Sequence, residues 1–133
     1  MQSVWLQSPF FSSKLDFHMK MIKCYMQFEK LDEIREKLFA LGVPGMSVAE
    51  VKGIGKPLSQ MQSDPDPGKS RVPQFHHRIE ISIVLEDESV DEVVEAMTTT
   101  LRTGKLGDGK IFVLPVEDAV RVRTGEKGTQ ALY

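Results

Sequence analysis

The spacing of apolar residues predicts a strand, a helix and a second strand before residue 55. Apolar and polar residues alternate over residues 21–26, as they do in a strand with one buried face. Apolar residues then recur at helical spacing (Leu31, Ile34, Leu38 and Leu41), and Gly42 is placed to end the helix. In residues 46–51 the valines stand among small and polar neighbours, which predicts the second strand.

The same kind of pattern returns after residue 78. Ile79, Ile81 and Ile83 alternate with polar residues, which predicts a strand with one buried face. Ser89 and Glu92 have the spacing of a capping box, which predicts a helix start there. The helix that follows carries a core stripe of Val90, Val93, Val94, Met97 and Leu101. Residues 111–116 predict a last core strand, and residues 119–123 a short extended one.

The order strand, helix, strand, strand, helix, strand is that of the ferredoxin-like βαββαβ fold, in the α+β class. In that fold both helices cover one face of an antiparallel sheet. The other face also needs a cover, and in a subunit this small another copy of the chain supplies it most simply. We therefore expect an oligomer.

Size, charge and cysteine content narrow the function classes. The 133 residues fit one domain, and a net charge of -2 without a basic stripe gives no reason to expect nucleic acid. Cys24 is the single cysteine and cannot form an internal disulfide, so we expect a reducing compartment and a cytoplasmic location. No apolar run approaches the roughly 20 residues that span a bilayer, so we expect no membrane insertion.

Two segments do not follow the periodic pattern. Residues 1–18 hold the single Trp and three of the seven Phe, and we expect a disordered extension before a domain at 19–133. An aromatic docking arm is the alternative. Residues 56–77 hold four of the seven prolines and no usable period. Because loops beyond about 12–15 residues are unusual in compact domains and commonly functional, we expect this loop to carry the output.

Glycines and cations gather in three places. Residues 104–110 (GKLGDGK) separate the second helix from a strand, and their backbone N–H groups can cradle phosphate oxygens. Residues 52–56 (KGIGK) form a second such segment. Arg121 and Arg123 share one face of an extended segment, which suits forked contacts with phosphate. Together they indicate a polyanionic small ligand. The alternatives are a connecting turn and ion pairs with Glu117, Asp118 and Glu126.

The sequence places no residues as a catalytic nucleophile with its base. His76 and His77 are adjacent, so on a strand they point to opposite faces and cannot chelate one metal well. We therefore expect neither an enzyme nor a metal site.

Longer motifs carry a resemblance to a known family. They are KLD at 30–32, GMSV at 45–48, EVKGIG at 50–55, RTGKLGDGKIFV at 102–113 and VRVRTGE at 120–126. On these motifs the chain resembles, from Met19 to its C-terminus, the PII signal-transduction family. The resemblance implies a non-enzymatic homotrimer that binds adenine nucleotides (ATP, ADP or AMP) in the clefts between subunits.

The resemblance also implies which residues bind the nucleotide. One subunit would supply Gly53, Ile54, Gly55 and Lys56, with Gly107, Asp108, Gly109 and Lys110 of the B-loop at 103–110. Its neighbour would supply Gly45, Met46 and Ser47, with Arg121 and Arg123 of the C-loop at 120–127. Lys110 matches the lysine that contacts the phosphates, and Val84 a position near the adenine. Residues 56–77 match the T-loop, which docks onto a target enzyme, transporter or transcription regulator.

Departures from the family pattern change the expected input. Pro57 stands where a Gln usually helps to hold Mg²⁺ and 2-oxoglutarate, and it offers neither a side-chain acceptor nor a backbone N–H. Lys56 stands where the family usually has an Arg, and Arg78 where it usually has a Lys that pairs with 2-oxoglutarate. Ser82 stands at a position that is usually Glu. The tyrosines, Tyr25 and Tyr133, lie outside the loop, which excludes modification of a T-loop tyrosine.

We therefore expect a divergent PII protein whose 2-oxoglutarate sensing is lost or weakened and whose need for Mg²⁺ is open. Some divergent members are associated with carboxysomes and respond to bicarbonate, and a small anion near Lys56, His76 or Arg78 would suit that role in carbon metabolism. The alternatives are a conventional nitrogen-regulatory PII that senses ATP/ADP and 2-oxoglutarate, a slow ATPase in the same cleft, and a purely structural trimer.

Overall fold

The structure, a computed structural model, describes residues 18–55 and 74–133. In chain order the elements are β1 (Met19–Met26), the 3-10 turn η2 (Phe28–Lys30), α1 (Leu31–Ala40), β2 (Ser47–Gly53), β3 (His76–Glu86), α3 (Asp87–Leu101), β4 (Lys110–Val116) and the 3-10 turn η3 (Gly128–Leu132). The expected N-terminal extension lies outside the described residues except for His18, and the expected loop does so except for residues 74–77. Neither helix of the described part is long and apolar enough to cross a bilayer.

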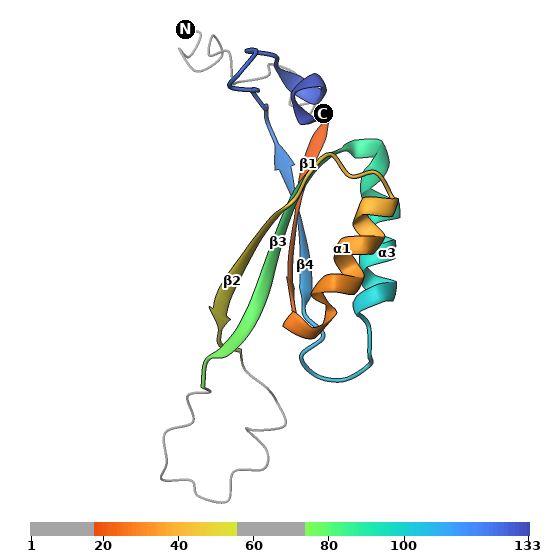
Figure 1. Cartoon of the computed structure of the whole chain (residues 1–133), viewed down its shortest axis with the longest axis vertical. Helices are drawn as coiled ribbons and strands as arrows, with labels where there is room; N and C mark the ends of the chain where they lie inside the picture. Colours follow the sequence, from red (N-terminus) through yellow and green to blue (C-terminus); the bar gives the residue numbers. More distant parts are fainter. Residues whose placement is uncertain (1–17, 56–73) are drawn as a thin grey trace, which may run out of the picture.

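The four strands form one antiparallel sheet in the order β2-β3-β1-β4, and both helices pack on one of its faces (Figure 1). β1 is central, because Ile22 pairs with Ile83 of β3 on one side and with Val113 of β4 on the other. This arrangement confirms the ferredoxin-like fold. The last two residues of the predicted loop, His76 and His77, belong to β3 instead, so that loop boundary was wrong.

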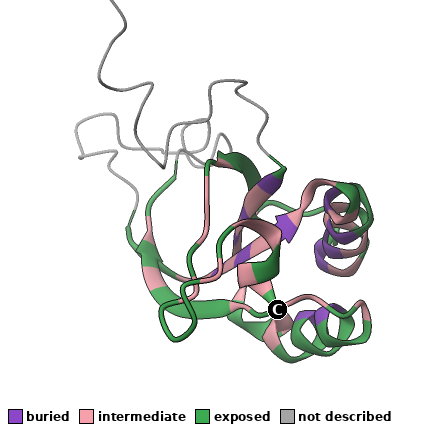
Figure 2. Ribbon diagram, turned by 90° about the horizontal axis from the view of Figure 1, so that it is seen from above, coloured by how far each residue is buried: buried purple, intermediate pink, exposed green. Residues whose placement is uncertain are grey.

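Alternate residues of the sheet form the core together with the helix stripes. Ile22, Cys24 and Met26 of β1 are fully buried, as is every second residue of β3 from Ile79 to Leu85. The helices add Ile34, Leu38, Val90, Val93, Met97 and Leu101, with Val94 partly buried beside them. In Figure 2 the buried positions, drawn in purple, lie on the helices and on the sheet. Full burial of one aliphatic side chain contributes roughly 1.5–3 kcal/mol, so this layer holds helices and strands together.

The start of α3 differs from the capping-box prediction. The helix begins at Asp87, its N-cap is Glu86, and no side chain caps it. The N–H of Asp87 donates instead to the carbonyl of His18 at 3.0 Å, and the Asp87 carboxylate accepts from Lys20 Nζ at 2.7 Å. The chain entering β1 therefore satisfies the first turn of this helix, which sequence spacing within the helix could not reveal.

The C-terminal segment is also different from its prediction. An extended strand was expected at 119–123, but this segment makes only an isolated bridge between Val120 and Lys127. The N–H of Gly125 donates to the carbonyl of Arg121 at 2.7 Å, which closes a turn over the residues between them. Gly125 has a φ of 76°, a conformation that glycine adopts without strain.

Within residues 18–55 and 74–133, no helix covers the sheet face away from α1 and α3. Register places Lys23, Tyr25, Glu80 and Phe112 on this face. Phe112 is 49% exposed and Leu114 is 41% exposed, whereas the core residues of the opposite face are almost fully buried. The helix side is therefore buried along the central strands β1 and β3 but leaves Val48 and Val113 of the edge strands half-exposed, and the other face also exposes apolar area.

The buried thiol of Cys24 gives a test of the core. Burial raises the pKa of this thiol to about 11, because the thiolate would lose its water. Since the thiolate is the reactive form, we expect the native protein to react with an aromatic disulfide reagent far more slowly than the guanidinium-unfolded protein. The raised pKa favours the folded state at low pH, and this contribution is lost as the pH rises through 9.0 toward about 11. Equal rates in the two states would contradict the burial.

Candidate functional site

The loop between α3 and β4 is organised by one carboxylate. Asp108 accepts hydrogen bonds from the backbone N–H of Thr103 at 2.8 Å and of Gly104 at 3.0 Å, and from the Thr103 hydroxyl. The N–H of Lys105 donates to the same hydroxyl oxygen at 3.2 Å. Hydrogen bonds from the side chain and backbone of Thr103 hold the pKa of Asp108 below its usual value. Asp108 therefore shapes the loop from within and stays ionised.

Two glycines let this loop pack on the end of β1. A Cβ on Gly109 would collide with the carbonyl oxygen of Tyr25, and the φ of Gly109 is 110°. A Cβ on Gly107, where φ is 97°, would lie 2.9 Å from Gln27 Nε2 and 3.7 Å from Arg78 Nη2. At Gly109 the backbone contact itself requires glycine, whereas at Gly107 the positive φ does so, because the flexible end of Gln27 could move aside.

Arg78 links this loop to the end of β2. Gly53 pairs with His76, and a Cβ on Gly53 would lie 3.3 Å from Arg78 Cγ. Arg78 therefore lies between the strand end that carries Gly53 and the loop that carries Gly107. Lys110 begins β4 beside the same loop, and no ion pair or hydrogen bond of its side chain occurs within residues 18–55 and 74–133. We call this end of the sheet the loop end.

The loop end has the features of an anion site. It combines backbone N–H groups of a glycine-rich loop with the cations Arg78 and Lys110. Such a concave set of N–H groups binds phosphate oxygens, and a guanidinium can add two parallel hydrogen bonds. Ile54, between Gly53 and Gly55, is 47% exposed and adds apolar surface at the same end.

The remaining predicted residues lie at the opposite end of the sheet, which we call the tail end (Figure 1). Gly45, Met46 and Ser47 lead into β2, and Arg121 and Arg123 follow β4. Ser47 pairs with Ser82, whereas Gly53 pairs with His76, so β2 separates the ends by roughly 20 Å at 3.4 Å per residue. Val84 is farther along β3 than Ser82 and therefore also belongs to the tail end. One chain thus carries the predicted site residues in two groups, one at each end of the sheet.

The two arginines do not share one extended face, contrary to prediction. Arg121 Nη1 lies 3.4 Å from Glu126 Oε1, and Nη2 donates to the carbonyl of Gln130 at 3.3 Å. The alternative of an ion pair with Glu126 is therefore correct for Arg121. Arg123 is exposed in the turn, without an ion-pair partner in the described part of the chain.

Sequence reasoning missed Gln27 and Tyr25 at the loop end. The Gln27 side chain lies near Gly107 of the loop, and Gly109 packs closely against the backbone carbonyl of Tyr25. Neither residue belongs to a recognisable motif. The sequence could have indicated them only by their position at the end of a strand that faces a glycine-rich loop. Lys56 lies outside the described residues, and His76 and His77 are exposed on β3. Residues 18–55 and 74–133 contain no group of His, Cys, Asp or Glu that could hold a metal ion.

These features define a class: a small α+β subunit with a ferredoxin-like sheet and with glycine-rich or basic segments at both of its ends. The chain belongs to the family described as nitrogen regulatory protein P-II, whose profile matches residues 19–126. The family resemblance of the sequence motifs is therefore confirmed.

Similar proteins support this membership over most of the chain. Nitrogen regulatory protein P-II of Cereibacter sphaeroides is 45% identical over 114 residues, 86% of this chain and 100% of that protein. The protein of the same name from Microchaete diplosiphon is 41% identical with the same coverage. The B. subtilis GlnK-ATP complex has a TM-score of 0.70 at 28% identity, covering 85% of this chain and 94% of that one. Arabidopsis thaliana PII bound to citrate has a TM-score of 0.68 at 29% identity, covering 86% and 90%.

Removing the Asp108 carboxylate tests the organisation of the loop. In Asp108→Ala we expect faster amide hydrogen exchange at Thr103 and Gly104, because both N–H groups lose their acceptor. Asp91→Ala, an exposed aspartate on α3, is the matched control and should leave both amides unchanged. In the wild type the amide shifts of Thr103 and Gly104 should titrate below pH 3.8, since the lowered pKa preserves these bonds until the pH falls through it. Unchanged exchange in Asp108→Ala would contradict this role.

Proposed function

We propose that this chain is a regulatory PII protein that binds adenine nucleotides in the clefts between subunits of a homotrimer. The observation that carries the proposal is the division of its anion-binding groups between the two ends of one sheet. Within one chain these ends are too far apart for one phosphate group, whereas the loop end of one copy can face the tail end of the next. The similar GlnK of B. subtilis forms a complex with ATP, which supports an adenine nucleotide as the ligand.

The uncovered face of the sheet supports assembly. Tyr25 and Phe112 pack edge to face with ring centroids 6.0 Å apart and leave apolar surface for a neighbour. Lys23 Nζ pairs with Glu80 Oε1 at 3.1 Å, and the Tyr25 hydroxyl donates to the same oxygen at 3.2 Å. The charges of this pair are therefore already satisfied before another copy packs on the face, so burial leaves neither of them unpaired.

Each half of the cleft has a distinct role in this proposal. At the loop end the N–H groups of residues 107–110, Lys110 and Arg78 hold the phosphates, with residues 53–56 beside them. The neighbour supplies residues 45–47 and Val84 near the base, and Arg121 and Arg123 at the phosphates. Arg121 would exchange Glu126 for phosphate, which is feasible because partly exposed ion pairs contribute only about 0–1 kcal/mol.

The proposed output is the segment 56–77, acting as the T-loop on a target protein. Gly53 and His76, where β2 ends and β3 begins, are paired at the loop end, so a bound nucleotide would bias the base of the loop between them and shift its population of conformations. A change of roughly 5- to 150-fold in target affinity would be ordinary for such coupling. The protein then acts by binding, without catalysis, in the cytoplasm.

The proposed input is adenine nucleotide with weakened 2-oxoglutarate sensing, because Pro57 lacks the acceptor and the N–H of the usual Gln. Bicarbonate, in carbon metabolism, is the proposed small anion near Lys56, His76 and Arg78. A conventional nitrogen-regulatory PII that senses 2-oxoglutarate is the second candidate, and the 45% identity to a protein named nitrogen regulatory protein P-II favours it.

Lys110→Ala tests the phosphate assignment. We expect ATP affinity to fall about tenfold or more, because a charge-assisted contact with the phosphates is lost, while the trimer persists. Calorimetry and sedimentation measure the two properties. Lys37→Ala, an exposed lysine on α1, should leave ATP affinity unchanged. Wild-type affinity in Lys110→Ala would show that the loop end is not the phosphate site.

Titration of 2-oxoglutarate separates the two candidate inputs. With ATP and Mg²⁺ present, we expect no micromolar binding to the wild type, and stronger binding to Pro57→Gln, which restores an acceptor. Tight binding to the wild type would instead support the conventional sensor. Release of phosphate from ATP, followed in the same samples, should be negligible; steady turnover would favour the ATPase alternative.

A further inference from the structure

A cavity lies on the helix side of the sheet, behind the glycine loop. It has a volume of about 410 Å³ and is bounded by the C-terminal half of α3, by β4 and by residues 108–110 of the loop. Pockets of roughly 300–1,000 Å³ commonly hold small molecules. The loop end described above uses the other side of the same short segment, so the two sites share only Gly109 and its neighbours.

The walls of this cavity are apolar. Leu101, Ile111 and Val113 line it together with Cys24. Cys24 pairs with Ile111, and Ile22 with Val113, so these side chains belong to the helix side of the sheet. Burial raises the pKa of the Cys24 thiol to about 11, so the floor is uncharged at neutral pH. The walls therefore favour a hydrocarbon group.

The polar groups of the cavity leave a positive charge unbalanced. Arg102 lines it, is exposed and forms no ion pair in the described part of the chain. Lys110 also lines it, but it pairs with Tyr25, so its side chain belongs to the face away from the helices. Asp108, the one carboxylate among the lining residues, already accepts from Thr103 and Gly104. The Thr98 hydroxyl is also engaged, since it donates to the carbonyl of Val94 at 2.8 Å. An anionic group of a ligand would therefore meet the guanidinium of Arg102.

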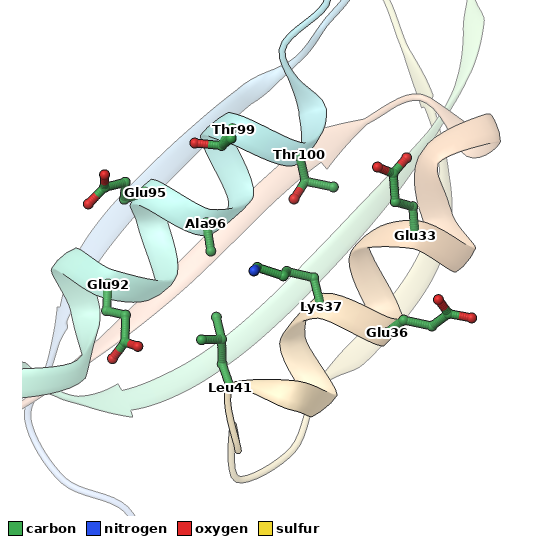
Figure 3. A pocket seen from close by; sticks show the side chains of 9 residues that line it. All are labelled: Glu33, Glu36, Lys37, Leu41, Glu92, Glu95, Ala96, Thr99 and Thr100. Carbon is green, nitrogen blue, oxygen red and sulfur yellow. The ribbon is translucent and has the colours of Figure 1, made fainter.

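The groove between α1 and α3 has the opposite charge (Figure 3). Its volume is about 620 Å³, and four carboxylates line it, from Glu33, Glu36, Glu92 and Glu95. Lys37 reaches from α1 toward α3 as the only cation among its lining residues. An anionic ligand is disfavoured there, which makes the groove an internal comparison for the cavity behind the loop.

We propose that the cavity between α3 and β4 binds a small amphipathic carboxylate, with its hydrocarbon tail against Leu101, Ile111 and Val113 and its carboxylate on the guanidinium of Arg102. Because Gly109 and Lys110 belong to both sites, occupancy changes nucleotide affinity at the loop end. This second effect rests on the proposed function, whereas binding of the carboxylate does not.

Three probes of equal chain length test the proposal on the full chain without nucleotide: hexanoate, hexan-1-ol and hexylammonium. We expect hexanoate to give saturable amide shifts at Leu101, Ile111 and Val113, hexan-1-ol to bind about tenfold more weakly, and hexylammonium to leave these residues unshifted. Absence of saturable hexanoate shifts at these residues, or equal binding of all three probes, overturns the proposal.

Matched variants locate the binding. Val113→Trp fills the cavity and should abolish the hexanoate shifts, whereas Val48→Trp should not. The two valines are 45% and 46% exposed, and register places both on the helix side of the sheet. Arg102→Gln should weaken hexanoate about tenfold, and Arg35→Gln on α1 should have no effect. Thermal unfolding of each variant checks that it folds, and unaltered binding in both Val113→Trp and Arg102→Gln refutes the location.

A last measurement separates this site from the proposed function. In the wild type we expect saturating hexanoate to change ATP affinity by at least about threefold, a coupling at the weak end of ordinary allostery. In Val113→Trp we expect hexanoate to leave ATP affinity unchanged. Saturable hexanoate binding without any ATP binding would leave the cavity assigned and the nucleotide proposal wrong. ATP binding without hexanoate binding would support the nucleotide proposal and overturn the cavity proposal.

Discussion

The structure depends on the burial of one face of a four-stranded sheet under two helices. Ile22 at the centre of this layer is flanked by Ile83 and Val113, which places β1 between β3 and β4. Both helices lie on one face, and the second face keeps Phe112 and Leu114 exposed. The separation of the predicted site residues and the open face of the sheet thus have a common origin in the strand order.

Close backbone contact, more than surface charge, shapes the loop end. Gly109 lies directly on the carbonyl of Tyr25, where any larger residue would push the loop away. Asp108 then fixes the preceding turn by accepting from consecutive N–H groups. By contrast, exposed pairs such as Arg35 with Asp32 contribute only about 0–1 kcal/mol each, since water screens them. Short-range fit therefore sets the geometry, and the cations supply attraction for a ligand.

The same loop segment connects both proposed sites. On one side it meets Arg78 and Gln27, and on the other it closes a cavity lined by Leu101 and Ile111. A segment of glycines with a single organising carboxylate can shift between arrangements more readily than a packed helix or strand. This gives a physical route by which a ligand behind the loop can act on one in front of it.

The sequence by itself determined the layers and the loop chemistry. The stripes that include Ile34 and Met97 and the alternation from Ile79 are local patterns, so the elements and the core face followed from them. The tertiary structure alone decided what satisfies the ends of the elements and which residues meet. The His18 carbonyl replaced the expected cap of α3, and Arg121 turned to Glu126 instead of sharing a face with Arg123. Gln27 belongs to the loop end because its side chain lies near Gly107. These contacts join residues far apart in the chain or close a turn, and neither kind leaves a periodic signal in the sequence.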